Sequence, residues 1–594
     1  MTPFLIAAWH REDSGAVGLI RRLKTLLASD PSRWTIASEQ ADHLIAVPDG
    51  GRFTIEGNPR FPTLLIGDVF FREQSAGEAA SLPGIGRFKA YCEHLTAERW
   101  GAYLAVAPGI SGRLQIFRDP VGMRDCATWT AAGIRFVASD PVPWLYLTAP
   151  DGLAVEWQLA AGILARPSAV LETSPLTGIE TVPAGTLVEF DGRELRATRL
   201  WHPRQFCSSA RDNQNDLTEF RITIAQCVDT WIERYPNSMV ELSGGFDSAV
   251  VAAAGKGRHP RCGINFFTAD LSGDERRYAR VVANHVGMPL HEMFMPVATL
   301  SEDDLRGMPI GLRPGLGSTT LFHDRRLSEV AAQVGTDALL TGQGGDAIFF
   351  QHPTPLIAGE PQFPRFNARA HARLAQWCET SIWTTARHAF GRSIEREMSR
   401  PDEAMRQFPL ALPASNAPLD WAGDLSGLTP AKRLQVEAIA GDRAAFGPSW
   451  RSQAMTVVHP LLSQPLIEKV LGIDVFKLTE GRRDRALARR AVSCLLPDAI
   501  TRRAGKGALT QFFGRSLAGS TSFLQAYLLD GELAAHGVFD RTRLEPMLDR
   551  DFLMQFDCYG KILSALVMER WAREWRDRLA AIGQLTRQPA FAKN

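Results

Sequence analysis

The chain has 594 residues, 45% of them apolar and 22% charged, so its length fits about two to four globular domains with large cores. The 66 basic residues nearly balance the 65 acidic ones, which argues against a general nucleic-acid binder. The eight cysteines form no C-x-x-C pair, which argues against zinc ribbons and small disulfide scaffolds and is typical of a reducing cytosol. No stretch approaches the roughly 20 apolar residues of a membrane span. We therefore expect a cytoplasmic protein that binds neither membranes nor nucleic acid.

The first 200 residues have the pattern of a β-rich domain. Residues 1–13 contain a short apolar run without a basic flank, which predicts a buried strand rather than a signal peptide. Short apolar runs separated by Gly, Pro and Asp then predict strands joined by turns, at 63–71, 102–107, 113–119, 134–139 and 185–190. A helical pattern occupies 15–29. Sheets packed on one another would produce this pattern.

A polar, irregular stretch at 199–216 predicts a boundary between a domain at 1–205 and a domain at 206–594. Beyond it, strands predicted at 237–243, 264–270 and 337–346 alternate with helices, which is typical of a parallel α/β sheet. After residue 365 the pattern becomes helical. The helix predicted at 429–445 starts with Thr429 as its N-cap and Pro430 in its first turn, and 481–496 is another amphipathic stretch.

The sharpest motif is S-G-G-F-D-S at 243–248, where a strand ends and a helix begins. Ligands of open parallel sheets bind at the carboxyl ends of the strands. Two glycines let the backbone approach a phosphate, and the N–H groups of the helix start face the anion. Asp247 fits an anion site if a cation such as Mg²⁺ lies between its carboxylate and the phosphate. A Gly-rich turn with a capping Asp is the alternative interpretation.

These residues match the S-G-G-x-D-S pyrophosphate loop of the ATP pyrophosphatase group, and residues from about 100 to 510 resemble the asparagine synthetase family. R-D-P-V-G at 118–122 resembles a turn of that family's glutaminase-like domain. T-G-Q-G-G-D at 341–346 resembles its second loop, and H-P-L-L at 459–462 resembles its P-F-L-D segment. The resemblance implies an α+β glutaminase-like (Ntn-type) β-sandwich domain. An α/β adenine-nucleotide alpha-hydrolase-like (PP-loop) synthetase domain with a helical C-terminal region would follow it.

Members of this family adenylate a carboxylate with ATP, release pyrophosphate, and let an amine attack the acyl-adenylate. The resemblance implies that ATP is held by both loops and by the end of the second strand, through Leu242, Ser243, Gly244, Gly245, Ser248, Thr268, Thr341 and Gly342. It also implies that Asp247 and Asp346 bind the Mg²⁺ on the leaving pyrophosphate, where metal ions and fixed dipoles stabilise the developing charge.

Two further residues match the family's synthetase site. Asp442 stands where the family has an acidic residue, and Lys506 matches the catalytic lysine of a C-terminal loop, which can stabilise oxyanion and phosphate charge. An exposed helix carboxylate and a surface lysine are the alternatives for these two. The five arginines within 482–490 are more typical of a solvated helix face than of a phosphate site.

Two departures from the family pattern decide the expected activity. Glutamine-dependent members carry a catalytic cysteine directly after the initiator Met, but here that position is Thr2 and the first cysteine is Cys92. The N-terminal domain is therefore expected to be structural or to dock a peptide, and the substrate must supply the amine. Gln343 stands where asparagine synthetases are acidic and β-lactam synthetases have a tyrosine. A neutral amide can orient an amine but cannot act as a base; a loop-stabilising amide is the alternative.

The stretch 459–507 looks like the lasso-peptide macrolactam synthetase (lasso cyclase) branch, which also lacks the glutaminase cysteine. That likeness implies adenylation of an Asp or Glu side chain of a short core peptide and attack by the peptide's own N-terminal amine. The implied partners are the precursor peptide, a leader peptidase and a leader-recognition protein. The alternatives are a β-lactam-synthetase-like enzyme, an ammonia-dependent asparagine-synthetase-like enzyme, and a non-catalytic peptide-binding scaffold.

Overall fold

The computed structural model describes most of the chain. The described residues are 3–10, 14–58, 61–72, 88–108, 113–190, 195–207, 216–255, 257–270, 273–316, 321–391, 409–412, 421–503, 505, 507 and 509–587. Thr2 and Lys506 lie outside them.

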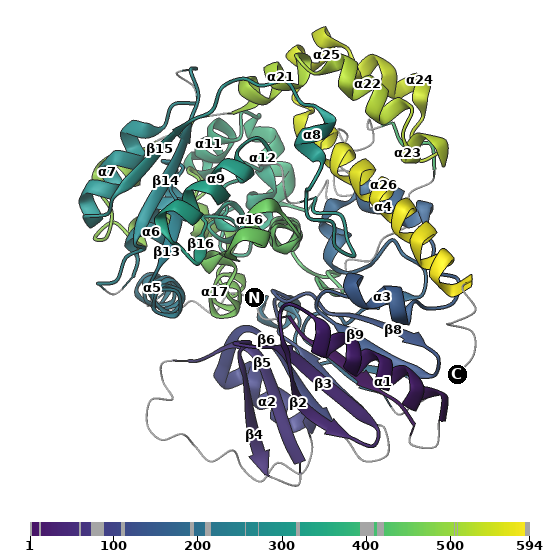
Figure 1. Cartoon of the computed structure of the whole chain (residues 1–594). Coiled ribbons are helices and arrows are strands. Elements are labelled where there is room, and N and C mark those ends of the chain that lie inside the picture. The colour runs from purple at the N-terminus through teal and green to yellow at the C-terminus, as the bar shows by residue number, and fades with distance from the viewer. Residues whose placement is uncertain are drawn as a thin grey trace.

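The N-terminal part of the described chain is a sandwich of two antiparallel sheets (Figure 1). The first sheet has the order β10-β8-β9-β1-β3-β2 and contains β1 (Leu5–Ala8), β2 (Trp34–Gln40), β3 (His43–Pro48), β8 (Ala127–Ala131), β9 (Ile134–Ala138) and β10 (Ile179–Thr181). The second has the order β12-β11-β7-β6-β5-β4 and contains β4 (Phe53–Asn58), β5 (Phe61–Phe71), β6 (Arg99–Pro108), β7 (Leu114–Arg118), β11 (Thr186–Phe190) and β12 (Leu195–Arg199).

Alternation of side chains along the strands builds this sandwich. On β1, Ile6 and Ala8 enter the core between the two sheets, whereas Leu5 and Ala7 pack on the opposite side beneath helices. Helices α1 (Ser14–Ser29), α3 (Val142–Thr148) and α4 (Trp157–Ala165) contribute to that outer core. Helix α2 (Phe88–Glu98) covers the second sheet. The β-rich sandwich expected from the sequence, its buried first strand and the helix at 15–29 are confirmed.

A five-stranded parallel sheet follows in the described part of the chain, in the order β15-β14-β13-β16-β17. Its strands are β13 (Ser238–Glu241), β14 (Cys262–Phe267), β15 (Leu290–Phe294), β16 (Ala338–Leu340) and β17 (Thr456–Val458). From the central strand β13, the sheet continues through β14 and β15 on one side and through β16 and β17 on the other. The carboxyl ends of β13 and β16 therefore form the topological switch point, where open sheets of this kind bind ligands.

Helices cover both faces of the parallel sheet (Figure 1). One face packs on α9 (Leu321–Val334) and on Met455, which follows α16 (Trp450–Ala454). The other face packs on α5 (Asp216–Arg234), α6 (Phe246–Ala253), α7 (Arg276–Val286), α15 (Pro430–Asp442), α17 (Gln464–Leu471) and α19 (Ala486–Ala491). The other α-helices in the described part of this region are α8 (Glu302–Leu305), α10 (Gly345–Ile348), α11 (Ala368–Trp377), α12 (Ile382–Ala389), α18 (Val475–Thr479) and α20 (Asp498–Thr501).

The sequence predicted the start of α15 correctly but not the form of 481–496. Thr429 accepts a hydrogen bond from the Lys432 N–H, and Pro430 opens the helix. In contrast, 481–496 is not one helix, because Glu480 and Arg485 adopt left-handed backbone conformations with φ of 52° and 53°. These two reversals end α18 and start α19 in a new direction.

The C-terminal region is helical, as expected, and returns to the sandwich. It contains α21 (Thr510–Ala518), α22 (Thr521–Leu529), α23 (Glu532–Ala535), α24 (Arg541–Leu544), α25 (Arg550–Gln555) and α26 (Tyr559–Arg587). Helix α26 packs against α3 and α4, with Trp571 and Trp575 fully buried in a core that also contains residues of β1 and α1. The boundary at residue 205 stays a prediction, and the parts on its two sides share a core.

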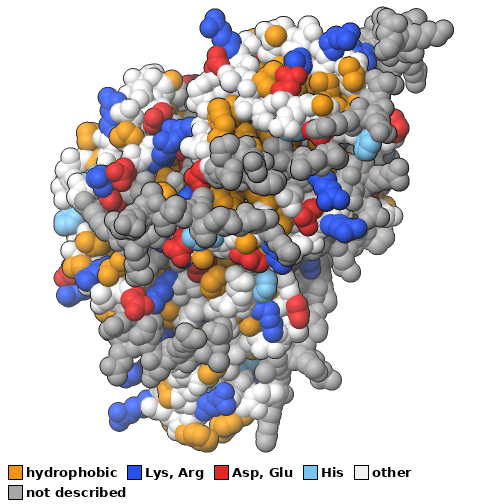
Figure 2. Space-filling view, turned by 90° about the horizontal axis from the view of Figure 1, so that it is seen from below, with side chains coloured by type: hydrophobic (Ala, Val, Ile, Leu, Met, Phe, Trp, Pro, Cys, Tyr) orange, Lys and Arg blue, Asp and Glu red, His pale blue; other side chains and the backbone are white. Residues whose placement is uncertain are grey.

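The face of the molecule shown in Figure 2 carries mixed charge. On the face shown in Figure 2, basic and acidic side chains are interspersed rather than gathered in one area. None of the helices in the described ranges combines the length and the apolar character needed to cross a bilayer.

Replacing Trp571 with Phe tests the packing of α26 against the rest of the molecule. The indole Nε1–H donates to the Leu312 carbonyl at 3.2 Å, and the phenyl ring leaves that buried acceptor unpaired. We expect a loss of about 1–3 kcal/mol and a lower melting temperature in calorimetry. The matched change of Trp383, which is 79% exposed, should alter stability by no more than about 0.5 kcal/mol. Equal melting temperatures for both variants would contradict this assignment.

Candidate active site

Two loops meet at the switch point, one after β13 and one after β16. A Cβ on Gly342 would lie 2.6 Å from the backbone nitrogen of Ser248, and a Cβ on Gly345 would lie 2.4 Å from Cγ of Asp247. Neither position has room for a side chain. The predicted loops, which are almost a hundred residues apart in the sequence, are therefore in backbone contact.

Serine hydroxyls close the first loop on itself. The hydroxyls of Ser243 and Ser248 are 3.0 Å apart, and Ser248 Oγ accepts the N–H of Ser243 at 3.2 Å. Gly245 is the N-cap of α6, so the first N–H groups of that helix lie beside the loop. Gly244 has a φ of 84° and packs against Glu275, which a larger residue would displace. The motif thus lies between a strand end and a helix start, as the sequence predicted, and its role in binding an anion stays a prediction.

The two predicted metal-binding aspartates converge on one guanidinium. Arg485 donates from Nε and Nη2 to the Asp247 carboxylate at 2.8 and 2.7 Å, and from Nη2 also to Asp346. Burial works to lower the pKa of Arg485, but the charges of Asp247, Asp346 and Asp484 raise it above its ordinary value. The left-handed backbone of Arg485 turns its side chain into the sheet end instead of along the helix face.

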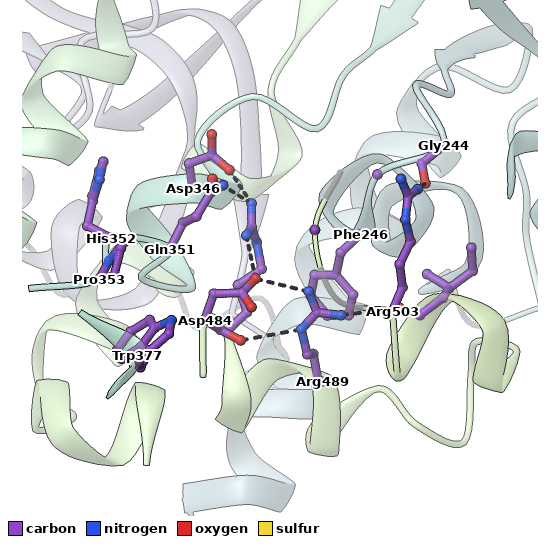
Figure 3. Close-up of a pocket in the computed structure, with 14 residues that line it drawn as sticks. Gly244, Phe246, Asp346, Gln351, His352, Pro353, Trp377, Asp484, Arg489 and Arg503 are labelled. Atoms are coloured by element: carbon purple, nitrogen blue, oxygen red, sulfur yellow. Dashed lines mark hydrogen bonds and ion pairs between the residues drawn. The ribbon is translucent and has the colours of Figure 1, made fainter. Parts of the chain in front are cut away.

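We call the first cavity beside these aspartates the arginine cavity (Figure 3). It measures about 380 Å³, and its walls include Gly244, Asp346, Arg485, Arg489, Arg503 and Gly505. Arg489 binds Asp484 at 3.0 Å and lies over the Phe246 ring at 4.8 Å. Arg503 binds the Gly244 carbonyl at 3.0 Å and also pairs with Glu275. Each guanidinium is thus held in place before a ligand arrives.

The prediction of a solvated arginine face at 482–490 is therefore wrong for two of its members. Arg485 and Arg489 are buried and line the cavity. Arg482 and Arg490 are exposed and pair with Glu480, as predicted. Helical spacing does not distinguish these two, because Arg485 has a left-handed backbone and stands before the first residue of α19.

We call the second cavity the acidic cavity. It measures about 280 Å³ and is lined by the four carboxylates Glu241, Asp247, Asp346 and Asp442, together with Arg451 and residues of both loops. It shares Gly245 and Asp346 with the arginine cavity. The two cavities therefore adjoin at Asp346, one of the two predicted metal-binding residues.

Sequence reasoning missed the ionic network at one wall of the acidic cavity. Arg451 donates to Glu241 at 2.7 Å and to Asp324 at 2.6 and 2.9 Å. Burial tends to raise the pKa of Glu241, but Arg451 and His323 outweigh burial and hold that pKa well below its usual range. Glu241 is thus a carboxylate anion at the end of the central strand. No motif marks Glu241, and its partners come from distant segments.

A ring of hydrogen bonds joins Gln343 to Asp442, two residues predicted for the reaction. Gln343 Nε2 donates to Asp442 Oδ1 at 2.9 Å. The Gln343 N–H donates to Thr341 Oγ1 at 3.2 Å, and that hydroxyl lies 2.7 Å from His459 Nδ1. His459 Nε2 reaches the Ala445 carbonyl at 3.3 Å, three residues beyond Asp442. Since Nε2 faces a carbonyl, the partners assign the proton to Nε2 and leave Nδ1 to accept from Thr341.

The structure places the remaining predicted residues less directly. The Leu242 side chain is fully buried in the core, so only its backbone can face a ligand. Thr268 follows β14, is buried, and donates to the Asp270 carbonyl at 3.3 Å; it lines neither cavity. Lys506 lies outside the described residues, and its neighbour Gly505 lines the arginine cavity.

The donor set fits Mg²⁺ in chemistry. Carboxylate oxygens of Asp247 and Asp346 both lie within hydrogen-bond reach of one cationic atom, Arg485 Nη2. Oxygen ligands are those that Mg²⁺ prefers. Within the described ranges, no group of three or more His, Cys, Asp or Glu side chains is arranged to hold a metal. A Mg²⁺ ion here would take its other ligands from phosphates and water.

Acid should weaken the hydrogen-bonded ring through His459. Burial lowers the pKa of His459 from 6.5 to about 4, so the unfolded chain binds a proton that the folded chain excludes in this range. His459 therefore lowers stability by up to about 3 kcal/mol as pH falls from about 6.5 to about 4. Urea denaturation at stepped pH should show a flatter pH profile for His459→Gln than for the native protein. Parallel profiles would contradict the assignment.

Comparisons with known proteins identify the family. Solved structures with a low similarity include the allosteric regulatory enzyme of purine biosynthesis, at 11% identity and TM-score 0.21, covering 50% of this chain and 76% of the other. They also include glutamine phosphoribosylpyrophosphate amidotransferase from B. subtilis with ADP and GMP, at 8% identity and TM-score 0.21, covering 58% and 82%. A comparison with curated proteins gives no match. The asparagine synthase profile matches residues 219–573, more than half of the sequence, and the chain therefore belongs to this family of ATP-dependent ligases.

Proposed function

We propose that this protein is an AMP-forming amide ligase that closes a ring in a ribosomally made peptide. It adenylates an Asp or Glu side chain of the peptide and joins it to the peptide's own N-terminal amine, as lasso-peptide macrolactam synthetases do. The observation that carries the proposal is the junction of two cavities at Gly245 and Asp346, with Asp247 lining the acidic one. One cavity is lined by fixed arginines, as pyrophosphate release requires, and the other by carboxylates, as binding of an amine requires.

The phosphates belong in the arginine cavity. Gly244, Gly245 and the N–H groups at the start of α6 line this cavity and would bind them. The Ser243 and Ser248 hydroxyls line the adjoining acidic cavity and would reach the phosphates from that side. Arg485, Arg489 and Arg503 would neutralise the pyrophosphate. Asp247 and Asp346 would hold Mg²⁺, which supplies further neutralisation of the charge that develops on the leaving group. Leu242, Thr268, Thr341 and Gly342 would lie nearer the nucleoside. Lys506 keeps its predicted role beside the reacting acyl group.

The amine belongs in the acidic cavity. Asp442 is a carboxylate and can accept the proton that the attacking amine loses. Gln343 is an amide, so it serves by holding Asp442 at 2.9 Å rather than as a base. Gln343 would thus orient the amine indirectly, through Asp442, rather than by binding the amine itself.

One observation favours an amine brought by the substrate over ammonia from glutamine. The first cysteine of the sequence, Cys92, is buried in α2, and burial raises the pKa of its thiol, which disfavours the nucleophilic thiolate. The precursor peptide, leader peptidase and leader-recognition protein remain the partners we propose.

Product analysis by mass spectrometry tests the function. Purified protein, ATP, Mg²⁺ and a linear core peptide should yield AMP and a peptide lighter by one water. AMP with an amide on a small amino acid instead would assign a β-lactam-synthetase-like or asparagine-synthetase-like activity. Protein that consumes no ATP with any peptide or amino acid would be the non-catalytic scaffold.

Asp247→Asn should lower AMP formation by about a hundredfold or more, because the metal site loses a charge.

A pair of arginine variants tests the arginine cavity itself. Arg485→Gln removes the buried cation between Asp247 and Asp346 and should weaken binding of ATP by about tenfold or more. Arg482→Gln removes an exposed arginine of the same run and should leave ATP affinity unchanged. Titration calorimetry with ATP and Mg²⁺ measures both. Equal affinities for the two variants would overturn the assignment of the phosphates to this cavity.

A further inference from the structure

Arg443, the residue after Asp442, connects the acidic cavity to the N-terminal sandwich. Its guanidinium is buried, donates from Nη1 to Glu172 Oε1 at 2.7 Å, and donates from Nε to the Val121 carbonyl at 2.7 Å. It also lies over the Trp421 ring at 4.5 Å. Both of its oxygen partners belong to residues 1–205, whereas Arg443 starts the short helix η5 (Arg443–Phe446) beside the cavity.

The R-D-P-V-G turn forms the socket for this guanidinium. The Asp119 carboxylate accepts the N–H groups of Val121, Gly122 and Met123 at 2.7–3.1 Å. Arg118 donates to the carbonyls of Val182, Gly122 and Arg124 at 2.7–3.0 Å. A Cβ on Gly122 would lie 2.9 Å from Nη2 of Arg443, so the turn needs glycine at this place. The socket is therefore rigid and shaped to the guanidinium.

The buried ion pair between Arg443 and Glu172 is not expected to stabilise the fold. Both side chains are almost wholly removed from water, which makes an ion pair costly. Among the described residues, Arg443 Nη2 and Glu172 Oε2 also have no hydrogen-bond partner, which adds to that cost. A well-packed apolar pair would hold the same interface at least as well. The pair does fix the direction of the chain at Asp442.

We infer that the N-terminal domain takes part in amide formation through Arg443, which positions Asp442 for the attacking amine. This inference rests on the proposed function. Within η5, Arg443 is anchored to Glu172 and Val121. Two residues further on, the Ala445 carbonyl is held by His459, which also binds Thr341. Asp442 directly precedes these two anchors and is itself bound by Gln343. Arg443 is a positioning residue, because its guanidinium contacts Glu172, Val121 and the Trp421 ring and not the reacting groups.

The test separates adenylation from amide formation. In Arg443→Lys the charge remains, but a single ammonium cannot replace both guanidinium bonds. AMP formation should stay near the native rate, whereas the amide formed per AMP should fall about ten- to a hundredfold, because a misplaced amine lets water consume the acyl-adenylate. The double variant Arg443→Met/Glu172→Met leaves no unpaired buried charge and should give the same uncoupling in a folded protein.

Arg72→Lys is the matched control, because Arg72 pairs with Glu468 on α17 across another part of the same interface at 2.8 Å. It should leave the amide formed per AMP unchanged. If AMP and amide fall in parallel in Arg443→Lys, or if the ratio stays native, the positioning role is overturned.

Hydrogen exchange distinguishes this result from a failure of the proposed function, because it needs no substrate. Exchange at residues 441–447 should be faster in Arg443→Lys than in Arg72→Lys or the native protein. Unchanged exchange there would overturn the anchoring role even if the ligase activity is confirmed. A native protein that forms no AMP would refute the proposed function, while faster exchange would still show the anchor.

Discussion

The active site depends on the contact between two glycine-containing loops. Gly342 leaves no space for a side chain against the backbone of Ser248, and Gly345 leaves none against Asp247. This contact brings the carboxylates of Asp247 and Asp346 to one cationic atom. It also sets the two cavities side by side. A larger residue at either glycine would separate the aspartates, and one cation could no longer serve both.

Charge balance explains why composition alone does not reveal an anion site. The arginines that line the arginine cavity are each bound to a carboxylate of the same chain: Arg485 to Asp247, Arg489 to Asp484, and Arg503 to Glu275. The acidic partners keep the net charge at +1 while holding the guanidinium groups in fixed directions. Fixed dipoles and charges stabilise a developing anion without reorganisation. The cavity is therefore specific through geometry rather than through a basic excess.

The sequence predicted the elements whose signals are local. The apolar runs locate β5, β6, β7, β9 and β11. The missed strands are β2, β3, β4, β8, β10 and β12; of these, β2 and β12 are mostly polar and β10 has only three residues. In the site, the motif at 243–248 is correctly placed at the switch point. The pairing of Gln343 with Asp442, which are 99 residues apart, depends on tertiary packing that no spacing reveals. The inward direction of Arg485 depends on one left-handed residue within a basic run.

The R-D-P-V-G turn has a use in this molecule that requires no glutaminase chemistry. Asp119 accepts N–H groups of the turn, and Arg118 donates to the Gly122 carbonyl within it and to the Val182 carbonyl beside it. The turn so fixed presents the Val121 carbonyl to Arg443. The shared core formed by α26 and the sandwich holds the two parts together independently of this contact. The two parts therefore stay associated without a buried arginine at position 443. Because Arg443 directly follows Asp442 and is bound by the N-terminal part, the geometry of the acidic cavity depends on both parts of the chain.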